Sequence, residues 1–133
     1  ASACTDVSGF GLAGHLGAML RASGTSARVA LDALPLLPGA RECFARGLRS
    51  TAHPQNAKTR SALRIDPPSA SRPELDALFD PQTSGGLLFG VAAARGEDAI
   101  AQLRAAGDVA AVCIGEVTEA DADGALFSVV ARV

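Results

Sequence analysis

Hydrophobic and polar positions along the first half of the chain predict helices and strands in alternation. The first apolar stripe has the spacing of one helical face and consists of Leu12, Leu16, Met19 and Leu20. With Gly24 as a left-handed stop, it predicts a helix over residues 11–22. Gly14 and Gly17 lie off this stripe, and each weakens a helix relative to Ala. We therefore expect another part of the chain to pack closely against the helix backbone there.

The middle of the chain is more polar. Residues 27–31 form a strand candidate, and a second helix is expected from Pro38 to the stop at Gly47. Residues 50–72 predict a long excursion over the surface, interrupted by a strand candidate at Leu63–Ile65. In this excursion His53 and Asn56 could face a ligand, although exposed loop residues are the simpler interpretation. Residues 71–74 match a capping box, which predicts a short helix ending at Phe79.

The last third alternates again. Residues 87–91 have the pattern of a buried strand, and residues 96–106 form an amphipathic helix that Gly107 ends. Two further strands, residues 109–117 and 126–130, are joined by a loop that we interpret as a hairpin turn. Cys113 lies in an apolar run and is expected in the core. The predicted fold class is α/β (α+β), a layered domain with a mixed β-sheet covered by helices.

Composition and charge narrow the classes of protein. The 133 residues suffice for one domain, and 48% apolar with 20% charged residues are typical of a globular chain. A net charge of −2 with no Trp or Tyr argues against nucleic-acid binding. No apolar run is long enough for a membrane span and no signal-peptide pattern is present, so a cytoplasmic protein is predicted. Three widely spaced cysteines argue against a disulfide framework and a thiolate zinc site.

The first stretch with candidate chemistry lies just before the first helix. Asp6 is followed by Ser8 and Gly9, whose small side chains leave backbone N–H groups uncovered. Phosphate groups bind readily at a helix N-terminus, and a nearby carboxylate can hold Mg²⁺ that the phosphate also ligates. The same residues also fit an Asp or Ser cap on an ordinary helix, with glycines for packing. His15 is interpreted as a hydrogen-bonded helix histidine rather than a ligand.

The second candidate stretch is a loop that leads into the strand at residue 87. It consists of Thr83, Ser84, Gly85 and Gly86. Two hydroxyls and two glycines can form a concave row of N–H donors that suits phosphate oxygens. A plain Gly-Gly turn between helix and strand explains the same residues.

Taken together, residues 5–16 and 78–88 resemble the two signature stretches in the C-terminal half of selenophosphate synthetase, also named selenide, water dikinase. Residues 34–40 and 114–117 fit the same family in the right order. The resemblance covers nearly the whole chain. The related aminoimidazole ribonucleotide synthetases, thiamine-monophosphate kinases and hydrogenase maturation proteins share the architecture but are less similar in these motifs.

The resemblance implies an ATP-dependent function. The family makes selenophosphate from selenide, ATP and water, releasing AMP and phosphate with Mg²⁺ as a cofactor. It implies that Asp6 helps to hold Mg²⁺ on the ATP phosphates, and that the loop of residues 83–86, with Ser8 and Gly9, lies near the phosphate end of the same cleft. Family members generally have Thr where this chain has Ser8, so the hydroxyl is kept.

The family's N-terminal half has no counterpart in these 133 residues. We therefore expect residues 1–133 to be a single C-terminal domain that works with its own N-terminal ATP-binding domain, as a homodimer when full length, and that is inactive alone. Two alternatives are a related ATP-using enzyme of the same architecture and a non-catalytic packing module. If the domain completes a pocket for Mg²⁺ and the ATP phosphates, Asp6 and the loop of residues 83–86 are expected on one side of it.

Overall fold

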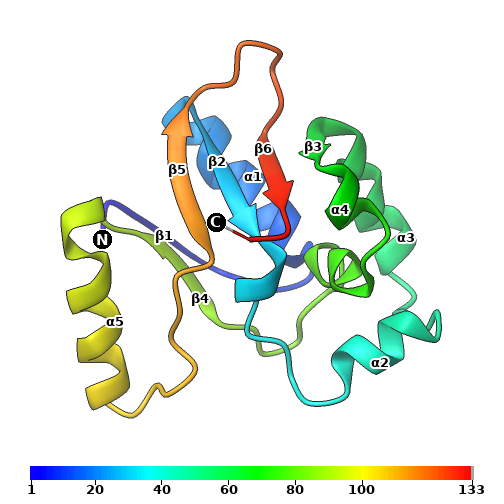
Figure 1. Ribbon diagram of the computed structural model, residues 1–133, viewed down its shortest axis with the longest axis horizontal. Coiled ribbons are helices and arrows are strands. Elements are labelled where there is room, and N and C mark those ends of the chain that lie inside the picture. The colour runs from blue at the N-terminus through cyan, green and yellow to red at the C-terminus, as the bar shows by residue number, and fades with distance from the viewer. Residues whose placement is uncertain (133) are drawn as a thin grey trace.

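The computed structural model describes residues 1–132, which contain two β-sheets and several helices. The larger sheet has four strands in the order β3 (Leu63–Ile65), β6 (Phe127–Val130), β2 (Thr25–Ala30) and β5 (Gly115–Glu119). β2 pairs in parallel with β6 and antiparallel with β5, so the sheet is mixed, as predicted (Figure 1). The smaller sheet is an antiparallel ribbon of β1 (Ala3–Asp6) and β4 (Leu87–Gly90).

Helix α1 (Gly11–Ser23) covers one face of the four-stranded sheet (Figure 1). Its buried apolar residues belong to the same core cluster as the inward side chains of β2 and β6: Ala13, Leu16, Leu20, Ala27, Val29, Phe127 and Val129. The expected close packing on α1 is found at Gly17, where an added side chain would meet Leu126. At Gly14 an added side chain would meet only Phe10, the residue that precedes the same helix.

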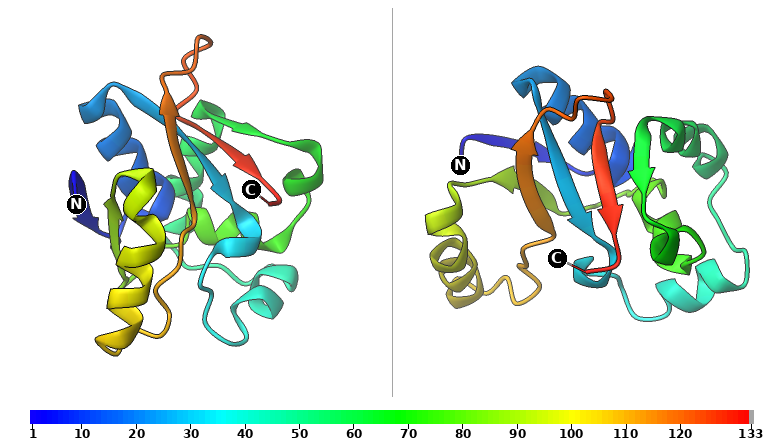
Figure 2. Two further views of the ribbon diagram at one scale, coloured as in Figure 1. Left: turned by 60° about the vertical axis from the view of Figure 1, so that its left-hand side comes forward. Right: turned by 45° about the horizontal axis from the view of Figure 1, so that its top comes forward.

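The remaining helical elements lie around these sheets. At one side α5 (Gly96–Ala105), preceded by the short turn η4 (Ala93–Arg95), lies beside the ribbon (Figure 2). At the other side are several short elements: η1 (Leu31–Ala33), α2 (Ala40–Ala45), α3 (His53–Asn56), η2 (Ala57–Ala62), α4 (Pro67–Ala70) and η3 (Pro73–Leu78). No helix within residues 1–132 combines the length and apolar character needed to cross a bilayer.

Several predictions about strands were wrong. Residues 3–6, for which no strand was predicted, form β1, because β4 supplies their hydrogen-bonding partner. β5 and β6 do not form a hairpin, since β2 lies between them. Residues 109–114 lie outside any strand, and Cys113 is exposed rather than in the core. β4 is not buried in this domain, because Leu87 and Phe89 are exposed on the ribbon.

Residues 50–72 contain more regular secondary structure and more buried side chains than predicted. The strand at Leu63–Ile65 is confirmed as β3, but His53 and Ser69 on either side of it are buried. The capping box at residues 71–74 is wrong, since no side chain caps η3. Instead, Asp66 caps α4 by accepting a hydrogen bond from the Ser69 N–H at 2.8 Å.

Candidate functional site

The ribbon of β1 and β4 brings the two candidate stretches together. Asp6 lies opposite Leu87 in the antiparallel register, so it faces the end of the loop of residues 83–86. One residue further on, the Val7 N–H donates to the Gly86 carbonyl at 3.0 Å. The expectation that Asp6 and this loop lie on one side of the domain is confirmed.

The glycines of the two stretches have two different roles. A Cβ at Gly85 would lie 2.0 Å from the Val7 carbonyl oxygen, and one at Gly11 would lie 2.9 Å from the Leu78 carbonyl oxygen. These two glycines therefore let backbone segments approach each other. At Gly9 and Gly86, by contrast, an added Cβ would meet no atom within 4 Å. The backbone at Gly9 and Gly86 is open to an approaching ligand.

Hydrogen bonds fix the turn formed by Ser8 and Gly9. The Ser8 carbonyl accepts from the N–H groups of Gly11 and Gln82, both at 3.0 Å. The Ser8 N–H donates to Nε2 of His15 at 3.1 Å. The Asn56 side-chain amide donates to the Gly9 carbonyl at 2.9 Å. The turn is thus held by hydrogen bonds with four other residues, namely Gly11, Gln82, His15 and Asn56.

The alternative interpretation of Asp6 and Ser8 as helix caps is wrong. Phe10 is the residue before α1, and no side chain accepts a hydrogen bond from the first turn of that helix. Asp6 is exposed, and within residues 1–132 its carboxylate forms no ion pair. Its charge is therefore available to a cation from outside.

The loop of residues 83–86 offers backbone donors. All four residues are exposed. In the part of the chain that the structure describes, none of their N–H groups donates to a protein acceptor. Consecutive free N–H groups beside Gly9 and Gly86 suit an anion with several oxygens, such as a phosphate group. The donor set thus fits the phosphates of a nucleotide.

Only part of a metal site is present at Asp6. Among the described residues no group of three or more His, Cys, Asp or Glu side chains is close enough to hold a metal ion. Mg²⁺ is usually bound through one or two carboxylates together with phosphate oxygens and water. Asp6 fits one such carboxylate, and further carboxylates would have to come from outside these residues.

Behind the loop, buried charges anchor η3. Glu74 is 2% exposed and accepts a hydrogen bond from Arg72 at 2.8 Å, while Arg41 lies 2.7 Å from the same oxygen. The hydrogen bond from Arg72 is the main cause that lowers the pKa of Glu74, opposed by burial. Because η3 leads directly into Phe79 and the loop, this anchor fixes where the loop begins.

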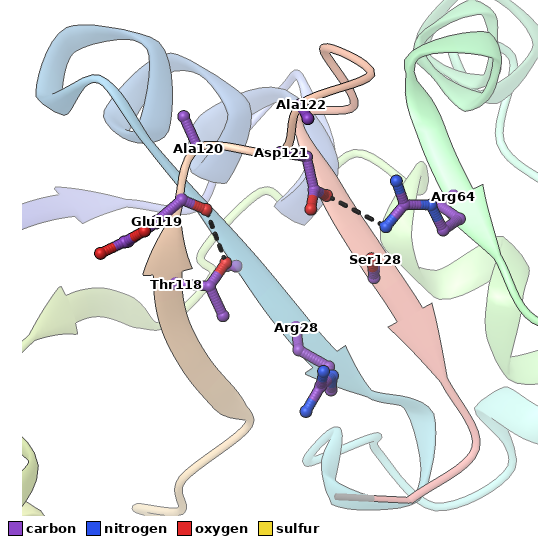
Figure 3. A pocket seen from close by; sticks show the side chains of 9 residues that line it. Arg28, Arg64, Thr118, Glu119, Ala120, Asp121, Ala122 and Ser128 are labelled. Atoms are coloured by element: carbon purple, nitrogen blue, oxygen red, sulfur yellow. Dashed lines mark hydrogen bonds and ion pairs between the residues drawn. The ribbon is translucent and has the colours of Figure 1, made fainter.

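Two hollows lie elsewhere on the surface. One, of about 290 Å³, opens on the sheet face away from α1 and is lined by charged and polar side chains that include Arg28, Arg64 and Asp121 (Figure 3). These charges are neutralised locally, since Arg28 pairs with Glu116 and Arg64 pairs with Asp121. The other, of about 630 Å³, lies between β4 and α5. Neither of these two hollows is lined by the predicted site residues, which are Asp6, Ser8, Gly9 and residues 83–86.

The interpretation of His15 as a hydrogen-bonded helix histidine is confirmed, although the sequence did not indicate that its partner is the turn at Ser8. Asn56 is half-buried rather than an exposed loop residue, and its amide holds the same turn at Gly9. Asn56 stands 47 positions after Gly9 in the chain. No local pattern marks such a contact, because only the packing of α3 beside α1 creates it.

Comparisons with known proteins identify the family of the chain. Residues 1–127 match the model of the family described as AIR synthase related protein, C-terminal domain. The chain is 41% identical over 117 residues to the selenide, water dikinase of Pelobacter propionicus, a match that covers 88% of this chain and 34% of that protein. It is 45% identical over 89 residues to the enzyme of the same name from Geobacter metallireducens, covering 67% of this chain and 26% of that protein.

A third relative, the selenide, water dikinase of Caldanaerobacter subterraneus, is 35% identical over 121 residues, covering 89% of this chain and 34% of that protein. The chain thus spans between a quarter and a third of the length of these curated relatives. The resemblance to selenophosphate synthetase drawn from the two motifs is confirmed. The chain belongs to the family of AIR synthase related C-terminal domains.

Proposed function

We propose that this chain is the C-terminal domain of a selenophosphate synthetase and completes the site for the phosphates of Mg²⁺–ATP. The whole enzyme would convert selenide, ATP and water into selenophosphate, AMP and phosphate. The observation that carries the proposal is the meeting of Asp6 with the donor-rich loop of residues 83–86 across β1 and β4. The similarity to selenide, water dikinases along 67–89% of the chain supports the choice of reaction.

In this proposal Asp6 contributes one carboxylate to the metal. The remaining carboxylates and the adenine pocket would come from an N-terminal ATP-binding domain, in keeping with relatives of which the matched part of this chain covers only 26–34%. Bound Mg²⁺ neutralises negative charge on phosphate oxygens during phosphoryl transfer. Asp6 is suited to this role because its carboxylate is exposed beside the loop.

The loop and the turn would bind the phosphate oxygens. The N–H groups of Thr83, Ser84, Gly85 and Gly86 have no acceptor among the described residues, and Gly9 and Gly86 leave space for close approach. Closing this surface over ATP would exclude water from the reacting phosphate. The hydroxyl of Ser8 lies at the same turn and would add a polar group to the site.

Because Asp6 is a single carboxylate, we propose that the 133-residue chain alone hydrolyses no ATP. ATP turnover by the purified chain would contradict this. The homodimer stays a prediction of the family resemblance, and the cytoplasmic location stays a prediction from the sequence pattern.

The test is Asp6→Ala in the full-length protein, with Asp108→Ala as the matched control. Both residues are exposed aspartates, but Asp108 follows α5 away from the loop. Loss of a metal ligand should lower Mg²⁺-dependent AMP formation by about 100-fold or more, with an unchanged melting temperature. Unchanged turnover in Asp6→Ala would favour the packing module instead. Faster turnover with another acceptor than with selenide would favour a related enzyme.

A further inference from the structure

The turn at Ser8 and Gly9 is held by the side chains of His15 and Asn56. We propose that His15 and Asn56 are positioning residues, which fix the backbone of this turn for binding Mg²⁺–ATP, and that His15 does so as the neutral Nδ1–H tautomer. The inference rests on the proposed function. It names residues that touch the turn and not the nucleotide itself.

The hydrogen bond from Ser8 determines the protonation state of His15. A backbone N–H can only donate, so Nε2 of His15, at 3.1 Å, must be the acceptor and carry no proton. The ring proton of the neutral imidazole then resides on Nδ1. The Ser8 hydroxyl lies 3.2 Å from the same Nε2. The ring of Phe10 packs against the imidazole with centroids 5.9 Å apart, which restrains its orientation.

Asn56 connects the two candidate stretches through one amide group. Its side-chain nitrogen donates to the Gly9 carbonyl at 2.9 Å and to the Phe79 carbonyl at 3.0 Å. Gly9 precedes α1 and Phe79 follows η3, so the two hydrogens of one side chain link the turn to the segment that begins the loop. A carboxylate at this position would place an acceptor against two carbonyl oxygens and lose both hydrogen bonds.

The geometry favours a role in the site over a role in the core. The core of α1 is formed by Ala13, Leu16 and Leu20, whereas Gly9 is exposed and open on its outer side. The turn is therefore not covered by packing, and its order depends on hydrogen bonds from His15 and Asn56 together with those to Ser8. Losing one of them should loosen the turn more than it weakens the whole domain.

The experiment uses the full-length protein with His15→Phe, His15→Gln and Asn56→Asp, and with Gln55→Glu as the control. His15→Phe keeps a planar ring without an acceptor, and His15→Gln supplies an amide oxygen that can accept from Ser8. Gln55→Glu makes the same amide-to-carboxylate change as Asn56→Asp on an exposed neighbour. Hydrogen exchange of the Ser8 amide, ring nitrogen NMR of His15, and KM and kcat for Mg²⁺–ATP are measured.

We expect the Ser8 amide to exchange about tenfold faster in His15→Phe and to return toward the wild-type rate in His15→Gln. KM for Mg²⁺–ATP should rise about tenfold in His15→Phe and Asn56→Asp with a smaller change in kcat, and should not change in Gln55→Glu. The wild-type spectrum should show the proton on Nδ1.

A proton on Nε2, or an unchanged exchange rate in His15→Phe, would overturn the inference even if Asp6→Ala abolishes turnover. Faster exchange of the Ser8 amide in His15→Phe without a change in KM for Mg²⁺–ATP would show that His15 has only a structural role, and this result would also overturn the inference. The Asp6→Ala arm reports on the proposed function separately. If Mg²⁺ dependence survives that substitution, the proposed function fails, and the positioning role for the nucleotide fails with it.

Discussion

Replacing Gly85 by Ala should separate β1 from the loop of residues 83–86. The added Cβ would lie 2.0 Å from the Val7 carbonyl oxygen and 2.9 Å from Cβ of Gln82. Carbon and oxygen atoms that are not bonded to each other do not approach to 2.0 Å, so the two backbone segments must move apart by about 1 Å. Both neighbours are fixed, because the Gln82 N–H donates to the Ser8 carbonyl at 3.0 Å.

The expected cost follows from the contacts that this movement breaks. Overpacking of a tight contact costs about 1–3 kcal/mol. The hydrogen bond from the Val7 N–H to the Gly86 carbonyl, 3.0 Å long, would stretch beyond its useful range and add about 1 kcal/mol. We therefore expect Gly85→Ala to lower the free energy of unfolding by about 2–4 kcal/mol, and the melting temperature by roughly 10 °C.

Urea unfolding followed by circular dichroism measures this difference, and Gly86→Ala is the matched control. An added Cβ at Gly86 meets no atom within 4 Å, so its free energy of unfolding should change by less than about 0.5 kcal/mol. Equal effects of the two substitutions would refute the assignment of Gly85 to backbone packing. If Gly86→Ala weakens Mg²⁺–ATP binding in the full-length protein while stability is kept, Gly86 belongs to the open side of the loop.

Two further predictions concern the supporting structure. Leu78→Ala removes a fully buried side chain and should lower the free energy of unfolding by about 3 kcal/mol, whereas Leu87→Ala, at a residue 71% exposed, should change it by less than about 0.5 kcal/mol in urea unfolding of the chain. In the folded protein the pKa of Glu74 is lowered, mainly by the hydrogen bond from Arg72. The ionised carboxylate therefore stabilises the fold fully above its ordinary pKa of 4.5, and this stabilisation is lost as the pH falls through the lower pKa of the folded state. Glu74→Gln should therefore cost about 2–3 kcal/mol at pH 7 and show a flatter loss of stability below pH 4.5 in acid titrations; an unchanged slope would contradict the pairing with Arg72.

Local sequence signals predicted the two long helices well. The helix predicted over residues 11–22 is α1, Gly11–Ser23, and the one predicted over residues 96–106 is α5, Gly96–Ala105. Both end at glycines with positive φ, 63° at Gly24 and 105° at Gly107. A left-handed residue interrupts a helix wherever the rest of the chain lies, so these ends could be read from the sequence.

The strand order could not be predicted in the same way. The loop between β5 and β6 is short enough for a hairpin, and nothing within it excludes one. β2 lies between these strands because Ala27 and Val29 face α1 together with Phe127 and Val129. The strand order is therefore determined by packing throughout the core and not by the loop between β5 and β6. Likewise, β1 has few strand-favouring residues and is a strand only because β4 lies beside it.

For the candidate site, the sequence predicted which segments meet but not what holds them. The juxtaposition of Asp6 with the loop of residues 83–86 followed from the family motifs and is confirmed. The sequence indicated a hydrogen-bonded histidine at His15 but not its partner, and it did not indicate the contacts of Asn56, because both depend on side-chain positions set by tertiary packing. The same limit applies to glycines, because a motif does not distinguish Gly85, which packs, from Gly86, which is open.

The environment of Asp6 on the ribbon bears on how strongly it could hold a cation. Directly opposite residues and residues two apart share a face, so Asp6 shares its face with Leu87, Cys4 and Phe89, all of them exposed. In solvent, water around this face weakens the attraction between the carboxylate and a metal ion. Under the proposed function an N-terminal domain covers the face, and burying the apolar neighbours lowers the local dielectric constant, which strengthens that attraction. Weak Mg²⁺ binding by the isolated chain and strong binding by the full-length protein are therefore expected from one and the same carboxylate.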